Sequence, residues 1–182
     1  MYQRLLLPTD GSDASATAAE VAVALADQFD ADLHIIHVLE DDRSSTDSDG
    51  STGPDRRGEE AVQAAVELAT SAGVEATKRI IERGESIHEE ILSYTDQHDI
   101  DCIVMGTRGR SGLSLSRAVL GSVAELTLRE SSVPVMTVHE GTVVDGDISS
   151  ILVPTDGSEC AHTAVDHAGD LARSVDAKLH IV

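Results

Sequence analysis

Aromatic residues are almost missing from this 182-residue chain, which has two Tyr, one Phe and no Trp. Lysine is equally scarce, because only Lys78 and Lys178 are found among the 13 basic residues, whereas Asp and Glu number 33 and set the formal net charge at −20. Nonspecific binding to nucleic acid needs basic side chains that replace counterions, and platforms for single strands need aromatic rings. We therefore expect a protein that binds neither nucleic acid nor an anionic membrane surface.

Long apolar runs and cysteine pairs are also missing. No run approaches the roughly 20 apolar residues that span a bilayer, and the apolar stretch at the start is too short for a signal peptide. The two cysteines, Cys102 and Cys160, have neither metal-ligand spacing nor a disulfide framework. These features predict a cytoplasmic protein.

The acidic bias extends along the whole chain. In molar salt the Debye length falls to about 3 Å, so the repulsion among carboxylates is screened. We interpret the composition as a halophilic adaptation, in preference to an acidic face for basic partners.

An internal repeat dominates the organisation of the chain. The segment 4–12, ending in Pro-Thr-Asp-Gly-Ser, recurs at 150–158, and sixteen of the 33 positions from Arg4 to Ile36 are identical at a constant offset of 146. The second copy reaches only what would be its second strand. We expect a nucleotide-binding domain at 1–140, a linker at 141–149 and an incomplete second repeat at 150–182.

Within the first copy, short apolar runs alternate with helical periodicity. The pattern predicts strands at 3–8, 33–39, 74–82, 102–105 and 133–139. It predicts helices after Ser12 or Asp13, at 59–71, 86–98 and 116–131, with a polar loop at 40–58. This alternation is typical of an α/β three-layer sandwich with a five-stranded parallel sheet, that is, a Rossmann-like fold.

The first candidate loop follows the first strand as Pro8-Thr9-Asp10-Gly11. In parallel sheets, ligands bind outside the carboxyl ends of the strands where the strand order reverses. Asp10 could accept hydrogen bonds from a ribose, an adenine amine or a hydrated metal. The structural alternative is that its carboxylate only closes an Asx-turn before the helix.

The second candidate loop follows the fourth strand and contains two arginines between glycines, Arg108 and Arg110. Glycines at a strand-to-helix junction allow backbone N–H groups to approach an anion. Gly121-Ser122-Val123 lies in the predicted fourth helix. The loop matches neither the Walker pattern nor the dinucleotide fingerprint. We favour phosphate binding over a ligand-free flexible loop, because arginines are scarce in a chain of charge −20.

Together, the Pro8-to-Ser12 turn, His37-Val38, the segment 105–109, Gly121-Ser122-Val123 and Val133-Pro134-Val135 resemble the universal stress protein family. The resemblance covers residues 1–140 and, again, 149–182. It implies a five-stranded parallel α/β sandwich, a homodimer formed through the last strand at Val133–His139, and ATP as ligand.

The same resemblance implies a role for individual residues. Those expected to contact the adenine or the ribose are Pro8, Thr9, Asp10 and Val38. Those expected to wrap the ribose and phosphates are Met105, Gly106 and Gly109, and those expected to contact the phosphates are Gly121, Ser122 and Val123. Arg108 and Arg110 are added to this set by the charge argument above and not by the resemblance.

One departure from the family pattern concerns loop length. The ATP-binding branch has nine residues between its second and third glycines, whereas eleven residues separate Gly109 from Gly121 here. Both ends of the motif are present, so ATP binding stays the favoured hypothesis. The alternatives are a nucleotide-free interaction module and a slow Mg²⁺-dependent ATPase that uses Asp10.

Catalytic and metal-binding patterns are otherwise weak. His34 and His37 are three positions apart on a strand, so we expect them to face opposite sides of the sheet. Cys102 is interpreted as a buried small hydrophobe. The partial repeat has no glycine loop, so we expect no complete second ATP site, and we expect its open apolar edge to pack on the first unit, to pack on another chain or to leave it partly disordered.

Overall fold

The computed structural model describes residues 1–39, 53–82, 84, 86–108, 120–143 and 148–182. The chain divides into two compact units, one spanning Tyr2–Val144 and one formed by Asp145–Val182 with Met1. Each unit is described by itself below.

The larger unit is built on a parallel sheet of five strands. In chain order they are β1 (Arg4–Pro8), β2 (Asp32–Val38), β3 (Ala76–Ile81), β4 (Cys102–Gly106) and β5 (Val135–Val138). Their order across the sheet is β3-β2-β1-β4-β5, and every neighbouring pair is parallel. The fold class predicted from the sequence is confirmed.

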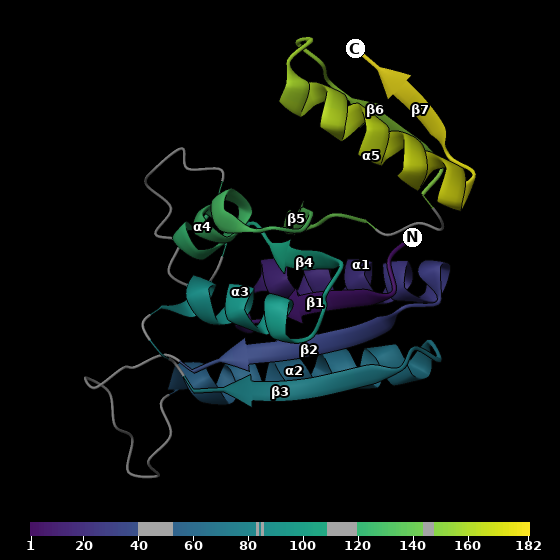
Figure 1. The fold of residues 1–182 in the computed structure, drawn as a ribbon. Coiled ribbons are helices and arrows are strands. Elements are labelled where there is room, and N and C mark those ends of the chain that lie inside the picture. The colour runs from purple at the N-terminus through teal and green to yellow at the C-terminus, as the bar shows by residue number, and fades with distance from the viewer. Residues whose placement is uncertain (40–52, 83, 85, 109–119, 144–147) are drawn as a thin grey trace. The chain divides into compact units, whose positions relative to one another are not determined.

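Four helices connect these strands and cover both faces of the sheet, which makes three layers (Figure 1). They are α1 (Asp13–Phe29), α2 (Gly53–Ser71), α3 (Ile87–Gln97) and α4 (Ser122–Glu130). Helices α1 and α2 contact each other on one face, while α3 and α4 contact each other on the other. No helix among the described residues is long and apolar enough to cross a membrane.

The core is aliphatic, since the chain has so few aromatic rings to bury. On the face covered by α3 and α4, strand residues pack against the inner sides of both helices. The members of this cluster include Leu6, Ile36, Val38, Ile91, Tyr94, Ile103 and Met105. On the other face, Ala18 and Ala22 of α1 are fully buried, and their small side chains allow the helix to lie close to the sheet.

Two predicted boundaries are wrong; the other helix and strand ends differ from prediction by no more than two residues. Helix α2 begins at Gly53, so residues 53–58 are helical and not part of a polar loop; residues 40–52 lie outside the described part. Pro54 is compatible with this start because the first-turn N–H groups of a helix have no intrahelical partner.

Helix α4 begins at Ser122 and not at residue 116. Gly121 is its N-cap, with extended dihedrals of φ −74° and ψ 160°. Gly121-Ser122-Val123 therefore forms the start of a helix, whereas the sequence pattern had suggested its interior. This difference matters for the site, because the N-terminus of a helix attracts anions and its interior does not.

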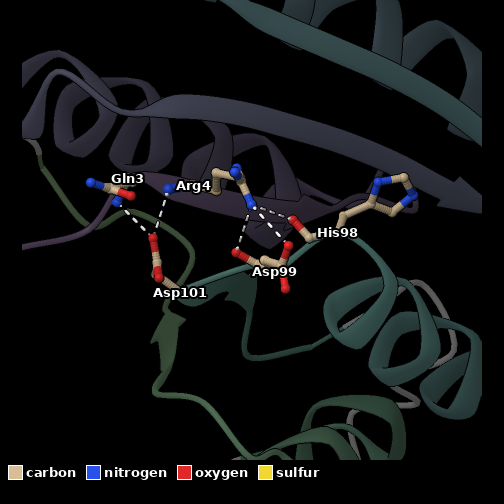
Figure 2. Close-up of polar contacts among 5 residues, drawn as sticks. All are labelled: Gln3, Arg4, His98, Asp99 and Asp101. Carbon is tan, nitrogen blue, oxygen red and sulfur yellow. Dashed lines mark hydrogen bonds and ion pairs between the residues drawn. The ribbon is translucent and has the colours of Figure 1, made fainter.

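The amino-terminal ends of the central strands are joined by a carboxylate (Figure 2). Oδ2 of Asp101 accepts hydrogen bonds from the backbone N–H groups of Gln3, at 2.7 Å, and Arg4, at 2.9 Å. The Arg4 guanidinium donates to the carbonyl of His98 at 3.1 Å and pairs with Asp99 at 3.4 Å. These contacts fix the start of β1 beside β4, in the register that pairs Leu5 with Cys102.

The smaller unit contains β6 (Ser150–Val153), α5 (Glu159–Val175) and β7 (Lys178–Ile181), with the two strands parallel. Its turn before α5 repeats the hydrogen bonds of the turn before α1. Ser158 caps α5 by accepting from the N–H of Ala161, at 3.2 Å, as Ser12 accepts from the N–H of Ser15 at 3.2 Å. The shared sequence therefore encodes the same local geometry twice.

Candidate functional site

The strand order reverses between β1 and β4, the two neighbours at the centre of the sheet. The chain leaves β1 toward β2, whereas it leaves β4 toward β5, so the loops after these strands diverge from a common point. Such a point is where ligands of open α/β sheets bind. The residues that follow the two strands are Thr9 and Asp10, and Thr107 and Arg108.

A tight turn connects β1 to α1. The N–H of Thr9 donates to the carbonyl of Ile36 on β2, at 2.9 Å. Gly11 has φ +75°, a conformation that L side chains disfavour, and a Cβ there would lie 2.9 Å from the carbonyl oxygen of Arg57. Oδ1 of Asp10 accepts from the N–H of Ser12 at 3.0 Å. The Asx-turn considered for Asp10 is thus present.

The end of β4 packs directly against the first turn of α1. A Cβ on Gly106 would lie 2.8 Å from the carbonyl carbon of Ala14 and 2.9 Å from the backbone nitrogen of Ser15. A residue without a Cβ is therefore needed at position 106 for β4 and α1 to pack this closely. Met105, the residue before it, is buried in the core cluster beneath α3 and α4.

Thr107 connects three elements at this edge of the sheet. Its N–H donates to the carbonyl of Val138 at the end of β5, at 2.8 Å, and its carbonyl accepts from the N–H of Gly121 at 2.7 Å. Its hydroxyl lies 3.3 Å from Nδ1 of His139. The buried Thr107 thus places the beginning of α4 beside the end of β4.

The two candidate loops are in direct contact. The hydroxyl of Ser12 donates to the carbonyl of Arg108 at 3.2 Å, across 96 residues of sequence. A second bond braces the first turn of α1, since the hydroxyl of Thr9 donates to that of Ser15 at 3.1 Å. The turn after β1 therefore meets the described start of the loop after β4.

Most of the residues predicted for the site gather at this edge of the sheet. Pro8 ends β1 and is followed by Thr9 and Asp10, while Met105 and Gly106 end β4 and Arg108 comes two residues later. Gly121 is the N-cap of α4, which begins with Ser122 and Val123. Val38 ends β2 with its side chain in the core cluster, against which Val123 also packs. Gly109 and Arg110 lie outside the described residues, so their predicted contacts stay predictions.

Several residues of this edge were not among the predicted contacts. Ser15, Thr107 and His139 brace the loops, while Ser12 had been considered only as a cap for the helix. Thr107 could have been found, because it lies inside the glycine motif. The sequence carried no signal for His139, since its partner Thr107 is 32 residues away, and the bond between Ser15 and Thr9 was not predicted although only six residues separate them.

Two interpretations made from the sequence, one for Cys102 and one for the histidines of β2, are confirmed. Burial raises the pKa of the Cys102 thiol to about 12, as expected for a buried hydrophobe. His34 bonds Tyr94 of α3, whereas His37 lies beneath Gly58 of α2, so the two histidines do face opposite sides of the sheet. Among the described residues, no group of three or more His, Cys, Asp or Glu side chains could hold a metal ion.

Comparison with protein families gives a clear match. The Universal stress protein family model matches residues 1–139 and, separately, 148–182. A universal stress protein of Methanocaldococcus jannaschii is 33% identical over 146 residues, covering 77% of this chain and 84% of the relative. The universal stress protein YxiE of Bacillus subtilis is 35% identical over 154 residues, covering 76% of this chain and all of YxiE.

Solved structures share the fold. A universal stress protein in complex with cAMP superposes with a TM-score of 0.59 at 24% identity, covering 77% of this chain and 99% of that one. The Archaeoglobus fulgidus protein in complex with dAMP gives a TM-score of 0.59 at 22% identity, covering 75% and 98%.

Proposed function

We propose that this chain, which belongs to the universal stress protein family, binds an adenine nucleotide where the ends of β1 and β4 meet, with ATP as the favoured ligand. Occupancy of this site would alter the contacts that the protein makes with a partner or a second copy. Under this proposal the protein has a regulatory role in the cytoplasm.

The observation that carries this proposal is the contact between the two loops. Because the Ser12 hydroxyl bonds the Arg108 carbonyl at 3.2 Å, the carboxylate-bearing turn after β1 and the described start of the loop after β4 lie side by side. A nucleotide needs both kinds of surface, one with acceptors for ribose hydroxyls or the adenine amine and one with N–H donors for phosphate. Neither loop offers both alone.

The beginning of α4 supplies the donors for phosphate. The first N–H groups of a helix have no intrahelical partner, and Gly121 has no side chain with which to cap them. These groups and the helix dipole favour a bound anion. In a protein of charge −20, such local positive potential is what would let a phosphate approach.

Each predicted contact has a chemical role under this proposal. Asp10 accepts from the ribose or adenine, with the backbone around it, and Val38 lines the base. The phosphates lie against the glycine loop and the start of α4. The residues assigned to this second part are Met105, Gly106, Arg108, Gly109, Arg110, Gly121, Ser122 and Val123.

The solved relatives support the ligand class. One binds cAMP and another dAMP, both adenine nucleotides, and both share the fold at TM-scores of 0.59. ATP carries two phosphates more than cAMP or dAMP, and the donors at the start of α4 would accommodate them. The lengthened segment between Gly109 and Gly121 is where this chain departs from the pattern of the ATP-binding branch.

Magnesium fits this site only as a companion of the nucleotide. The described residues contain no cluster of ligating side chains, whereas Mg²⁺ commonly binds through substrate phosphates and one or two carboxylates. Asp10 is the carboxylate in position to reach such an ion. We therefore assign Mg²⁺ no separate protein site.

Equilibrium binding of ATP and AMP, measured by calorimetry in molar KCl, tests the proposal. Asp10→Asn keeps an oxygen that can close the Asx-turn but removes the charge, and we expect it to weaken binding by about tenfold, the worth of one charge-assisted hydrogen bond. Asp156→Asn is the matched control, because Asp156 closes the same turn with Ser158 in the smaller unit, at 2.9 Å. We expect wild-type affinity from this control.

Two outcomes would contradict the proposal. The first is the absence of binding by the wild type at millimolar nucleotide. The second is an equal loss in the two variants, which would indicate an effect of charge alone and not of a site at β1.

A further inference from the structure

His37 lies at the carboxyl end of β2, one strand away from the Asp10 turn. Its side chain is only 2% exposed, and its Nδ1 lies 2.9 Å from the carbonyl oxygen of Thr9. A carbonyl oxygen only accepts hydrogen bonds, so Nδ1 must carry the proton in this contact. In this tautomer Nε2 is the ring nitrogen without a proton.

Nε2 has no hydrogen-bond partner among the described residues, although it is buried. An unsatisfied buried polar atom carries a free-energy cost. An aliphatic side chain on this strand would avoid that cost, as Ile35 does on the same face. What His37 supplies and an aliphatic side chain would not is therefore the hydrogen bond to the carbonyl of Thr9.

The bond replaces sheet pairing at the place where β1 ends. The N–H of Thr9 still pairs with the carbonyl of Ile36 on β2, whereas its carbonyl is bonded by the side chain of His37. The N–H and the carbonyl of Thr9 are thus both hydrogen-bonded to β2. Asp10 follows directly, so the direction in which its carboxylate leaves the sheet depends on this attachment.

Helix α2 closes over the same turn. A Cβ on Gly58 would overlap the ring atoms of His37, and Gly11 lies against the carbonyl of Arg57. The turn is therefore enclosed between the end of β2 and the beginning of α2. Any change in the orientation of the His37 ring would meet α2 on one side and Thr9 on the other.

We propose that His37, as the Nδ1–H tautomer, is a positioning residue that holds the carbonyl of Thr9 and thereby fixes the Asp10 turn in its nucleotide-binding conformation. The inference rests on the proposed function for its effect on affinity. It goes beyond that function because it assigns His37 an action through Thr9 and not a contact with the ligand.

Two isosteric variants separate positioning from packing. In His37→Asn the amide nitrogen occupies the place of Nδ1 and can donate to Thr9, so we expect affinity for AMP within about threefold of the wild type. In His37→Gln the amide reaches the place of Nε2 instead, and we expect binding about tenfold weaker, the equivalent of one lost hydrogen bond. Ile35→Val, on the same face of the same strand, is the packing control and should bind as the wild type does.

Two further measurements on the protein keep the test independent of nucleotide binding. Long-range ¹H–¹⁵N spectra of the wild type should show His37 protonated at Nδ1. Hydrogen exchange should be faster in His37→Gln than in His37→Asn at the amide of Thr9, which donates to Ile36 on β2, and at that of Ser12, which donates to Asp10 in the turn.

The outcomes are distinct for the two proposals. If no nucleotide binds to the wild type but the tautomer and the exchange pattern are as expected, the proposed function fails and the positioning of the turn stands. A ring protonated at Nε2, or a His37→Gln variant that binds and exchanges like the wild type, overturns the inference about His37.

Discussion

At the scale of single residues, the two histidines of β2 show how one strand places the same side chain in two environments. His37 is enclosed beneath α2, whereas His34 lies on the other face, with its Nδ1 2.9 Å from the hydroxyl of Tyr94 and its ring 5.6 Å from that of His98. Desolvation by burial, and next the charge on His98, lower the pKa of His34 below its usual value of 6.5. Asp32 opposes this shift, while Arg4 and Arg79 reinforce it.

This lowered pKa predicts a pH dependence of stability. Because the unfolded chain holds the His34 proton more tightly, the contribution is fully present above pH 6.5 and is lost as the pH falls from 6.5 through the folded-state pKa. His34→Asn keeps a donor for Tyr94 but does not titrate. We expect its free energy of unfolding in urea, measured between pH 8 and pH 5, to fall less steeply than that of the wild type. Parallel pH profiles would contradict this assignment.

At the scale of elements, Gly58 in α2 departs from the usual helix preferences. Glycine in a helix interior is less stable than alanine by about 1 kcal/mol, yet a Cβ here would overlap the ring of His37. Gly58 therefore lowers the helix propensity of α2 but leaves the space that α2 needs to lie against the end of β2. Its early start at Gly53 provides the turns that make this contact.

Gly58 and Gly169, which both lie in helix interiors, make a matched pair for measurement. We expect Gly58→Ala to destabilise the protein, because overpacking costs typically about 1–3 kcal/mol and exceeds the gain in propensity. Gly169, inside α5, has only Nη2 of Arg173 within reach of an added Cβ, at 3.8 Å. Gly169→Ala should therefore be neutral or stabilising. Urea unfolding of both variants measures the difference, and a stabilised Gly58→Ala would show that α2 does not close on His37.

At the scale of the whole molecule, the outer edge of β5 is the place where we propose that two copies pair. β5 is the last strand in the order of the sheet, with β4 as its neighbour. The carbonyls of Pro134 and Val138 bond β4, accepting from Ile103 and Thr107 at 3.0 and 2.8 Å. Backbone groups alternate in direction along a strand, so those of Val135 and Thr137 point to the outer edge.

Thr137→Pro tests this dimer with little disturbance of the sheet. Proline removes an N–H that faces outward and leaves the bonds to β4 in place. We expect the mass measured by light scattering to fall from that of a dimer to that of a monomer. Ile80→Pro removes an outward N–H on β3, the opposite edge strand, and should leave the mass unchanged. A wild-type monomer, or a dimer that survives Thr137→Pro, would contradict pairing through β5.

The sequence by itself determined the strands, most helix boundaries and the class of fold, because these follow from local periodicity, caps and glycine turns. It also determined the two Asx-turns, which the repeated Asp-Gly-Ser sequence forms at Asp10 and again at Asp156. The starts of α2 and α4 were misplaced. A polar, serine-rich segment precedes α2, where periodicity gives no sign of a helix start, whereas apolar residues at 113–120 continue the helical pattern before α4.

Only the tertiary structure decided what these turns do. The bond from Ser12 to Arg108 spans 96 residues, and that from His37 to Thr9 spans 28. Such contacts depend on the order of strands in the sheet, which places β1 between β2 and β4 and which local propensity does not encode. The physical reason is that a carbonyl at a strand end finds its partner on whichever element packs beside it, and that element is chosen by the fold of the whole unit.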